Sequence, residues 1–167
     1  IVNSFVYQRI LEDSMPNSTI PAWIGETYSQ CYEDVIIDSA LRAHVKTLGR
    51  PVGGITYVEI GANHPVCTSA SFLLQRRYGV NGILVEANPK LIPALQKHRP
   101  HDLVVNAAVT DEDVATVDFY VAPDNEISSL DQNFVKAWKE GQVQEKVTVP
   151  VIRINHLLET ASAAELV

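Results

Sequence analysis

The stretch that decides the fold runs from Tyr57 to Arg77 and reads YVEIGANHPVCTSASFLLQRR. It begins with a short apolar run, turns at Gly61, and continues into a segment with helical spacing. A buried strand, a glycine turn and a helix together make the first half of a parallel βαβ unit. We therefore predict an α/β domain whose open sheet is mostly parallel.

Two further apolar segments repeat this order. Residues 82–89, GILVEANP, predict a second strand, and residues 102–109, DLVVNAAV, predict a third. Asn88 and Pro89 suit the cap and first turn of the helix between them, and Pro93 must either kink that helix or mark its true start. Strands that alternate with helices indicate parallel pairing.

Helices are also expected on either side of the first strand. Residues 28–49 predict a helix with Ser29 as its N-cap and Gly49 as its stop. The helix that follows Gly61 is expected to end at Gly79. The apolar repeat of the earlier helix consists of Ile37, Leu41 and Val45.

After the third strand the pattern changes. Residues 115–121, ATVDFYV, alternate between apolar and polar, as a half-exposed edge or antiparallel strand does. Residues 146–154, KVTVPVIRI, predict another strand, in which Pro150 indicates an edge or a bulge. Asn155 is expected to cap a last short helix.

Between these two strands lies one more predicted helix, residues 128–141. Ser129 and Gln132 have the spacing of a capping box, and Gly141 is the expected stop. The apolar stripe of this helix, which we expect to lie in the core, consists of Leu130, Phe134 and Trp138.

Composition limits the classes of function. The chain has 167 residues, which suffice for one domain, and we assign residues 1–27 to an N-terminal arm and residues 28–167 to the α/β domain. A net charge of −7 disfavours nucleic acid and anionic membranes as partners. Only two cysteines are present and no long apolar run, so we expect a cytoplasmic protein that does not enter a membrane.

The turn at Gly61 does not suit a pyrophosphate. A dinucleotide-binding turn needs a second glycine where this chain has Asn63, and Pro65 offers no N–H group to a phosphate. An NAD-dependent oxidoreductase is therefore only our third hypothesis. The alternative that needs no ligand, a plain strand-to-helix turn, stays open.

A ligand without phosphates fits the same turn better. S-adenosylmethionine needs a close backbone approach, which Gly61 supplies, while Asn63 tolerates a left-handed conformation and carries an amide for hydrogen bonding. Glu59 would attract the ammonium group of this ligand. Glu86 ends the second strand 25 residues after Gly61, where a carboxylate would accept hydrogen bonds from ribose hydroxyls. Simple solvation of Glu86 is the competing interpretation.

These motifs resemble the FkbM family of S-adenosylmethionine-dependent methyltransferases. The likeness runs over about residues 28–160 and is carried by YSQCYEDVII, YVEIGANHPVCTSASFLL, GVNGILVEANP, LVVNAAVT and ISSL. It implies a Rossmann-like class I methyltransferase fold, S-adenosylmethionine as cofactor, and O-methylation of a hydroxyl on a sugar, glycan or natural product. The resemblance also places Thr68 or Ser69, and the helix start that contains Gln30, near the cofactor. For that helix start, placement of acids at the positive end of the helix dipole is an equal alternative that needs no ligand.

Beyond Leu158 the family has a strand resembling L-S-L-D-x-E-G, which this sequence lacks. We therefore expect a sheet that is incomplete on its C-terminal side. The second hypothesis is then a catalytically incomplete methyltransferase-like domain that serves interaction or assembly, which leaves a homo-oligomer open.

No catalytic residue can be assigned from the sequence. His64 is the most tempting general base, but a role in shaping the turn is the stronger interpretation, since no acid partner is identifiable. The other histidines lack the spacing of metal ligands, so no metal site is predicted.

Overall fold

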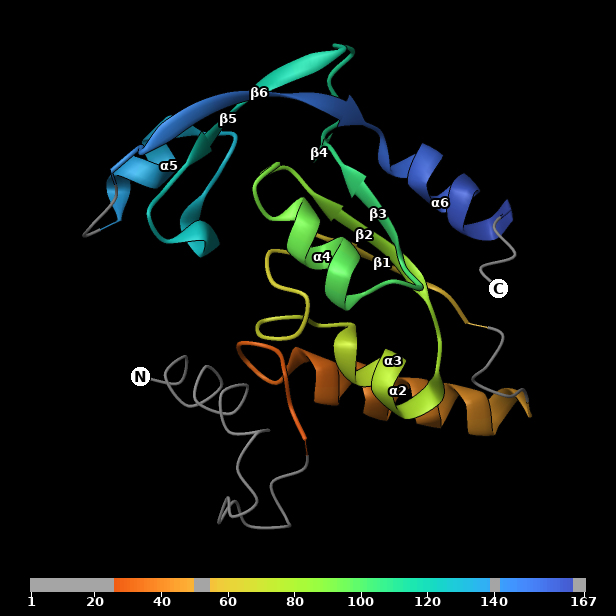
Figure 1. Ribbon diagram of the computed structural model, residues 1–167. Coiled ribbons are helices and arrows are strands. Elements are labelled where there is room, and N and C mark those ends of the chain that lie inside the picture. Colours follow the sequence, from red (N-terminus) through yellow and green to blue (C-terminus); the bar gives the residue numbers. More distant parts are fainter. Residues whose placement is uncertain (1–25, 50–54, 139–141, 164–167) are drawn as a thin grey trace, which may run out of the picture. The chain divides into compact units, whose positions relative to one another are not determined.

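The computed structural model describes residues 26–49, 55–138 and 142–163 (Figure 1). The expected arm of residues 1–27, apart from its last two residues, and the expected stop at Gly141 lie outside these ranges. The chain divides into two compact units. The first unit contains the residues before Thr56 and the segment His64–Val80. The second unit contains Thr56–Asn63 and the residues from Asn81 onward.

The second unit contains the predicted parallel sheet. Its strands β1 (Tyr57–Ile60), β2 (Gly82–Glu86) and β3 (Leu103–Asn106) pair in that order, and both pairings are parallel. Each strand coincides with an apolar run of the sequence. The chain is therefore a mixed α/β protein, as the sequence predicts.

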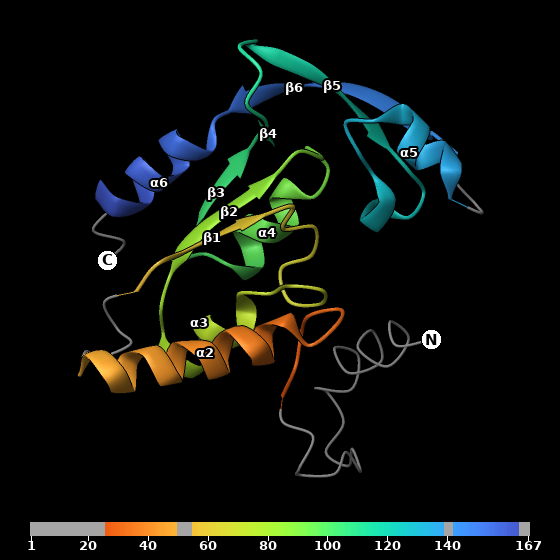
Figure 2. The same ribbon diagram turned by 180° about the vertical axis from the view of Figure 1, so that it is seen from behind.

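Helices cover both faces of this sheet, because successive side chains of a strand point to opposite faces. Ile83 on β2 packs against Leu157 of α6 (Ile154–Ala163). Its neighbour Leu84 packs against Leu95, which lies on helix α4. The views from the front and from behind show α4 and α6 on opposite sides of β2 (Figures 1 and 2).

Helix α4 (Ile92–His98) begins later than Asn88 and Pro89 led us to expect. Pro93 lies in its first turn, so this proline marks the true start of the helix and does not kink it. Asn88 instead forms the preceding turn. Its side-chain oxygen accepts a hydrogen bond from the Lys90 N–H, and its carbonyl accepts one from the Leu91 N–H.

The predicted third strand is broken into two. After β3, the N–H of Ala107 donates to the Glu86 carbonyl, and the chain then leaves the first sheet as β4 (Ala108–Val109). A second sheet begins here, with β4, β6 (Glu145–Ile152) and β5 (Thr116–Val121) in the order β4-β6-β5.

The second sheet confirms the antiparallel strand that alternation predicted, since β5 runs antiparallel to β6. Of the edge and the bulge that Pro150 led us to expect, the pairing fits the edge, because residues 145–150 of β6 pair, among the described strands, with β5 alone. Pro150 stands at the end of the ladder with β5, and the pairing with β4 starts at Val151. Asn155 is not a cap, because α6 begins one residue earlier, at Ile154.

The expected capping and burial of the helix after β5 are wrong. Helix α5 (Gln132–Ala137) is capped by Asp131, whose side chain accepts from the N–H of Asn133, and Ser129 pairs with Tyr120 instead. Phe134 is 46% exposed and Trp138 is 53% exposed, so they do not lie in the core. This helix is short, and it buries Val135 alone.

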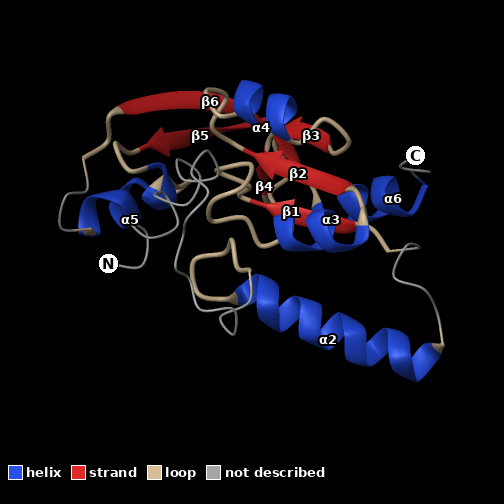
Figure 3. Cartoon of the chain, turned by 60° about the horizontal axis from the view of Figure 1, so that its bottom comes forward, coloured by secondary structure: helices blue, strands red, loops and turns tan. Residues whose placement is uncertain are grey.

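The first unit consists of α2 (Glu33–Leu48), α3 (Phe72–Tyr78) and their connecting segments (Figure 3). Both helices end at the predicted glycines, Gly49 and Gly79, which adopt left-handed conformations. Ser29 is not the N-cap residue of α2, although its hydroxyl accepts a hydrogen bond from a first-turn N–H.

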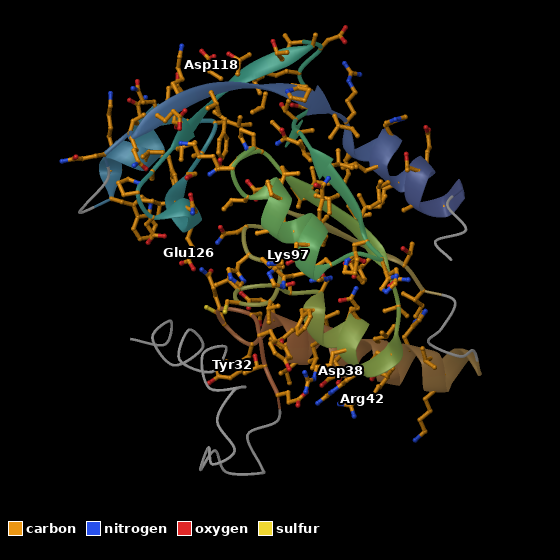
Figure 4. The ribbon with its side chains drawn as sticks, viewed as in Figure 1. Tyr32, Asp38, Arg42, Lys97, Asp118 and Glu126 are labelled. Carbon is orange, nitrogen blue, oxygen red and sulfur yellow. The ribbon has the colours of Figure 1, made fainter. Side chains whose placement is uncertain are left out.

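The buried face of α2 is polar. Asp38 is fully buried and accepts hydrogen bonds from Tyr78 at 2.5 Å and Arg77 at 2.7 Å, while Arg42 pairs with it one turn along the helix (Figure 4). Ile37, from the expected apolar stripe, is 40% exposed. Hydrogen bonds and ion pairs to the buried Asp38 carboxylate therefore link α2 to α3, in which Leu73 and Leu74 are buried.

A buried polar network lies at the start of the parallel sheet. Arg99 donates to Asp102 at 2.7 Å, and both side chains are fully buried. The Tyr57 hydroxyl donates to Asp102 at 2.6 Å, and the Gly82 N–H donates to the same carboxylate at 2.7 Å. Burial is the main cause that raises the pKa of the Tyr57 hydroxyl, and the hydrogen bond to Asp102 is the second. Gly82 is also required for packing, since a Cβ there would overlap the Tyr57 ring.

We predict that Asp102→Ala lowers the free energy of unfolding by about 3–5 kcal/mol, because it leaves Arg99 as a buried charge without its carboxylate. Urea unfolding followed by circular dichroism measures this change. The matched control is Asp118→Ala (Asp118 is labelled in Figure 4), which removes an exposed ion pair with Lys146 and should change stability little. Equal losses in the two variants would contradict the prediction.

Candidate functional site

The carboxyl ends of the three parallel strands meet at Glu86, the last residue of the central strand. Its backbone carbonyl accepts hydrogen bonds from the Ala107 N–H at 3.2 Å and from the side-chain amide of Asn106 at 2.8 Å. Its carboxylate accepts from the Asn63 N–H at 2.8 Å and from the Asn88 N–H at 2.7 Å. One residue thus joins the segments that follow β1, β2 and β3.

The Glu86 carboxylate is held in a buried position, with 5% of the residue exposed. Burial raises the pKa of this carboxyl above its ordinary value, although hydrogen bonds from the Asn88, Asn63 and Ala87 N–H groups act in the opposite direction. A carboxylate offers about four acceptor positions. The two backbone N–H groups of Asn63 and Asn88 therefore leave acceptor positions for a ligand.

The turn after β1 adopts the conformation that its sequence favours. Gly61 has φ +75° and Asn63 has φ +48°, so both are left-handed, which glycine and asparagine tolerate best. The N–H groups of Gly61 and Ala62 both donate to the Val85 carbonyl. A Cβ added at Gly61 would meet nothing within 4 Å, so the backbone there is open to an approaching group.

Glu59 lies in β1, half-buried, opposite Leu84 of β2. Strand alternation places it on the same face of the sheet as Tyr57, the face that α4 covers. It is separated from the left-handed turn by Ile60 alone. The structure therefore brings Glu59, Gly61, Asn63 and Glu86 together at one end of the parallel sheet.

The remaining two predicted site residues, Thr68 and Gln30, belong to the first unit. Thr68 is half-buried and has φ +61°, a strained conformation for a β-branched residue. This left-handed residue explains why α3 starts at Phe72 and not directly after the turn. Gln30 is exposed in the segment that leads into α2.

His64 shapes the loop between β1 and α3. Its Nδ1 atom accepts hydrogen bonds from the N–H groups of Val66 at 3.1 Å and Cys67 at 2.9 Å. The Nδ1 atom therefore holds the loop together, which is the role that the sequence favoured for this residue. Burial raises the pKa of the Cys67 thiol to about 11, so this residue stays a thiol and is no nucleophile.

Sequence reasoning missed two polar residues that contact the site, Asn106 and Asn125. Asn106 ends β3 opposite Glu86 and donates to the carbonyls of Glu86 and Ala87. The side chain of Asn88 donates to Asn125 at 3.2 Å. A signal existed for Asn106, because a polar residue at the carboxyl end of a predicted parallel strand belongs to the ligand-binding edge of such a sheet. No such signal marks Asn125.

No protein-family model, curated protein or solved structure matches this chain. Among the described residues, no cluster of three or more His, Cys, Asp or Glu side chains is arranged to hold a metal ion. None of the helices in the described ranges has the length and apolar character needed to cross a membrane.

The raised pKa of Glu86 predicts a specific pH dependence. The folded state binds this proton more tightly than the unfolded chain, so the contribution of Glu86 to the unfolding free energy falls as pH rises through the folded pKa. In Glu86→Gln this contribution is absent. The stability of the parent relative to the variant should therefore decrease as the pH rises above about 4.3, the ordinary pKa of a glutamate, and through the raised pKa of the folded state.

Urea unfolding at a series of pH values measures this difference. Glu112→Gln, which neutralises an exposed glutamate, is the control and should leave the pH dependence of the parent almost unchanged. A parent whose advantage over Glu86→Gln grows with pH would show that the ionised carboxylate is favoured in the fold, against the prediction.

Proposed function

We propose that this chain is an S-adenosylmethionine-dependent methyltransferase of the FkbM type, with a Rossmann-like fold. The proposed reaction is O-methylation of a sugar or natural-product hydroxyl. The proposal rests chiefly on the Glu86 carboxylate, which accepts a hydrogen bond from the Asn63 N–H, two residues after the open turn at Gly61. The motif resemblance supports the same assignment.

The residues at this edge fit the cofactor. Gly61 offers an open backbone surface, and Glu86, which accepts from two backbone N–H groups, retains acceptor positions for the ribose hydroxyls. Glu59 would face the ammonium end of the ligand. When bound, S-adenosylmethionine supplies an electrophilic methyl group, which an acceptor hydroxyl takes by in-line displacement while it gives up its own proton.

The chain's contribution to the reaction would be chiefly to hold the two reactants in line. A buried acid beside a rigid left-handed turn is suited to this, because neither group must rearrange when a ligand binds. His64 is assigned to loop structure, because its Nδ1 atom accepts hydrogen bonds from two N–H groups.

Two glycine substitutions test the cofactor site. Gly61→Ala and Gly79→Ala both place a Cβ on a left-handed residue with open space around it, so each should cost about 1–2 kcal/mol of stability. Only Gly61 belongs to the proposed site. We predict at least a tenfold loss of affinity for S-adenosylhomocysteine in Gly61→Ala alone.

Isothermal titration calorimetry measures these affinities. The parent chain must bind S-adenosylhomocysteine, and Gly79→Ala must bind it as the parent does. A folded parent that does not bind the ligand, or two alanine variants that lose affinity equally, would contradict the assignment.

A second candidate function is assembly, and the edge of the parallel sheet favours it. Within the described residues, β1 pairs with β2 alone, so the outer side of β1 has no neighbouring strand. Ile60 at its end is 51% exposed. An unpaired strand edge with an exposed apolar residue is a template for pairing with another chain.

We predict that Ile60→Lys abolishes any self-association through this edge, because a charged residue on an edge strand opposes pairing. Light scattering coupled to size-exclusion chromatography measures the molar mass over a range of protein concentrations. Leu158→Lys, which alters an apolar side chain of α6 that is also 51% exposed, is the control. A parent that stays monomeric at every concentration would remove the support for self-assembly.

A further inference from the structure

The loop after β2 is held from its far side by the part of the chain that carries β5 and β6. Ala87 packs against the apolar cluster that contains Phe119 and Val121. The ammonium group of Lys90 pairs with the carboxylate of Glu145, at the start of β6. Between these two contacts, the side-chain amide of Asn88 donates to the Oδ1 atom of Asn125, in the short 3-10 helix η2 (Asn125–Ile127).

The contact through Asn125 differs from the other two because Asn88 also touches Glu86. The N–H of Asn88 donates to Oε1 of Glu86, and Oε2 of Glu86 accepts the N–H of Asn63. A continuous series of hydrogen bonds therefore runs from η2 through Asn88 and Glu86 to the turn after β1. Its members are contributed by residues up to 62 positions apart in sequence.

Asn88 has little freedom to take another position. It is 2% exposed, and its Oδ1 atom is occupied by the N–H of Lys90. Its side-chain amide is a buried donor, which would be costly to leave unpaired. Asn125 is itself exposed, and it supplies the acceptor for this buried donor. If Asn125 were lost, the loop would have to move to give the donor another acceptor, and that movement would disturb the backbone N–H that Glu86 accepts.

We propose that Asn125 is a positioning residue that acts through Asn88 to hold the Glu86 carboxylate in place. The ion pair between Lys90 and Glu145 cannot replace Asn125 in this role. Its side chains are 62% and 38% exposed, and exposed ion pairs contribute little to stability. The consequence for ligand binding rests on the proposed function, since it requires that Glu86 contacts the ribose. The mechanical link from Asn125 to Asn63 does not depend on it.

Asn125→Ala removes the acceptor, whereas Asn125→Asp keeps an oxygen at the same position and should rescue the contact. Asn133→Ala is the matched control, because Asn133 is an exposed asparagine on α5. Amide hydrogen exchange of the ligand-free protein, followed by NMR, reports on the Asn63 and Asn88 N–H groups. We expect their exchange to become about 3- to 10-fold faster in Asn125→Ala and to stay unchanged in the other two variants.

Calorimetry with S-adenosylhomocysteine on the same proteins should show an affinity about 3- to 10-fold weaker in Asn125→Ala, with the thermal unfolding midpoint of the parent retained. If Asn125 served stability alone, Asn125→Ala would lower the thermal unfolding midpoint and leave the affinity for S-adenosylhomocysteine unchanged. Unchanged exchange at Asn63 in Asn125→Ala overturns the positioning role. A parent that does not bind S-adenosylhomocysteine overturns the proposed function, and the exchange data then decide the positioning role by themselves.

Discussion

The fold depends on the placement of one acidic residue at the end of the central parallel strand. The carbonyl of Glu86 is held by Ala107 and Asn106, and its buried carboxylate is held by the N–H groups of Asn63 and Asn88. A buried carboxylate without donors would be strongly unfavourable. The segments after β1 and β2 must therefore converge on the carboxylate, while the end of β3 is tied to the backbone carbonyl of the same residue.

Local features of the chain were predictable from sequence because their causes are local. Apolar runs predicted the parallel strands, although β2 alone of the three is buried throughout and the expected burial of β1 is only partial. Gly49 and Gly79 end helices because glycine adopts the left-handed conformation at low cost. The same reasoning held for the turn at Gly61 and Asn63. The position of Glu86 at a strand end was also readable, since it needed only the length of the apolar run before it.

The errors concern burial and contacts that local pattern does not determine. Helical periodicity implies that the apolar side of a helix is buried, yet α2 buries Asp38 because Arg77 and Tyr78 satisfy it from 39 and 40 residues away. In α5, Phe134 and Trp138 were assigned to the core. The helix has six residues and buries Val135 alone, and both aromatic side chains are exposed. Asn125 is a polar loop residue by sequence, and only the fold shows that it meets Asn88.

The contact between Tyr57 and Gly82 has a consequence for how this sheet is able to change. The two residues are directly opposite each other in adjacent strands, and the ring of one fills the space that a Cβ of the other would need. The backbone carbonyl oxygen of Tyr57 would also collide with that Cβ, so a smaller side chain at position 57 would not by itself make room. A residue larger than glycine at position 82 would have to push β1 and β2 apart, at the pair where Asp102 accepts from both the Tyr57 hydroxyl and the Gly82 N–H. Position 82 is therefore closed to substitution as long as the two strands keep this register.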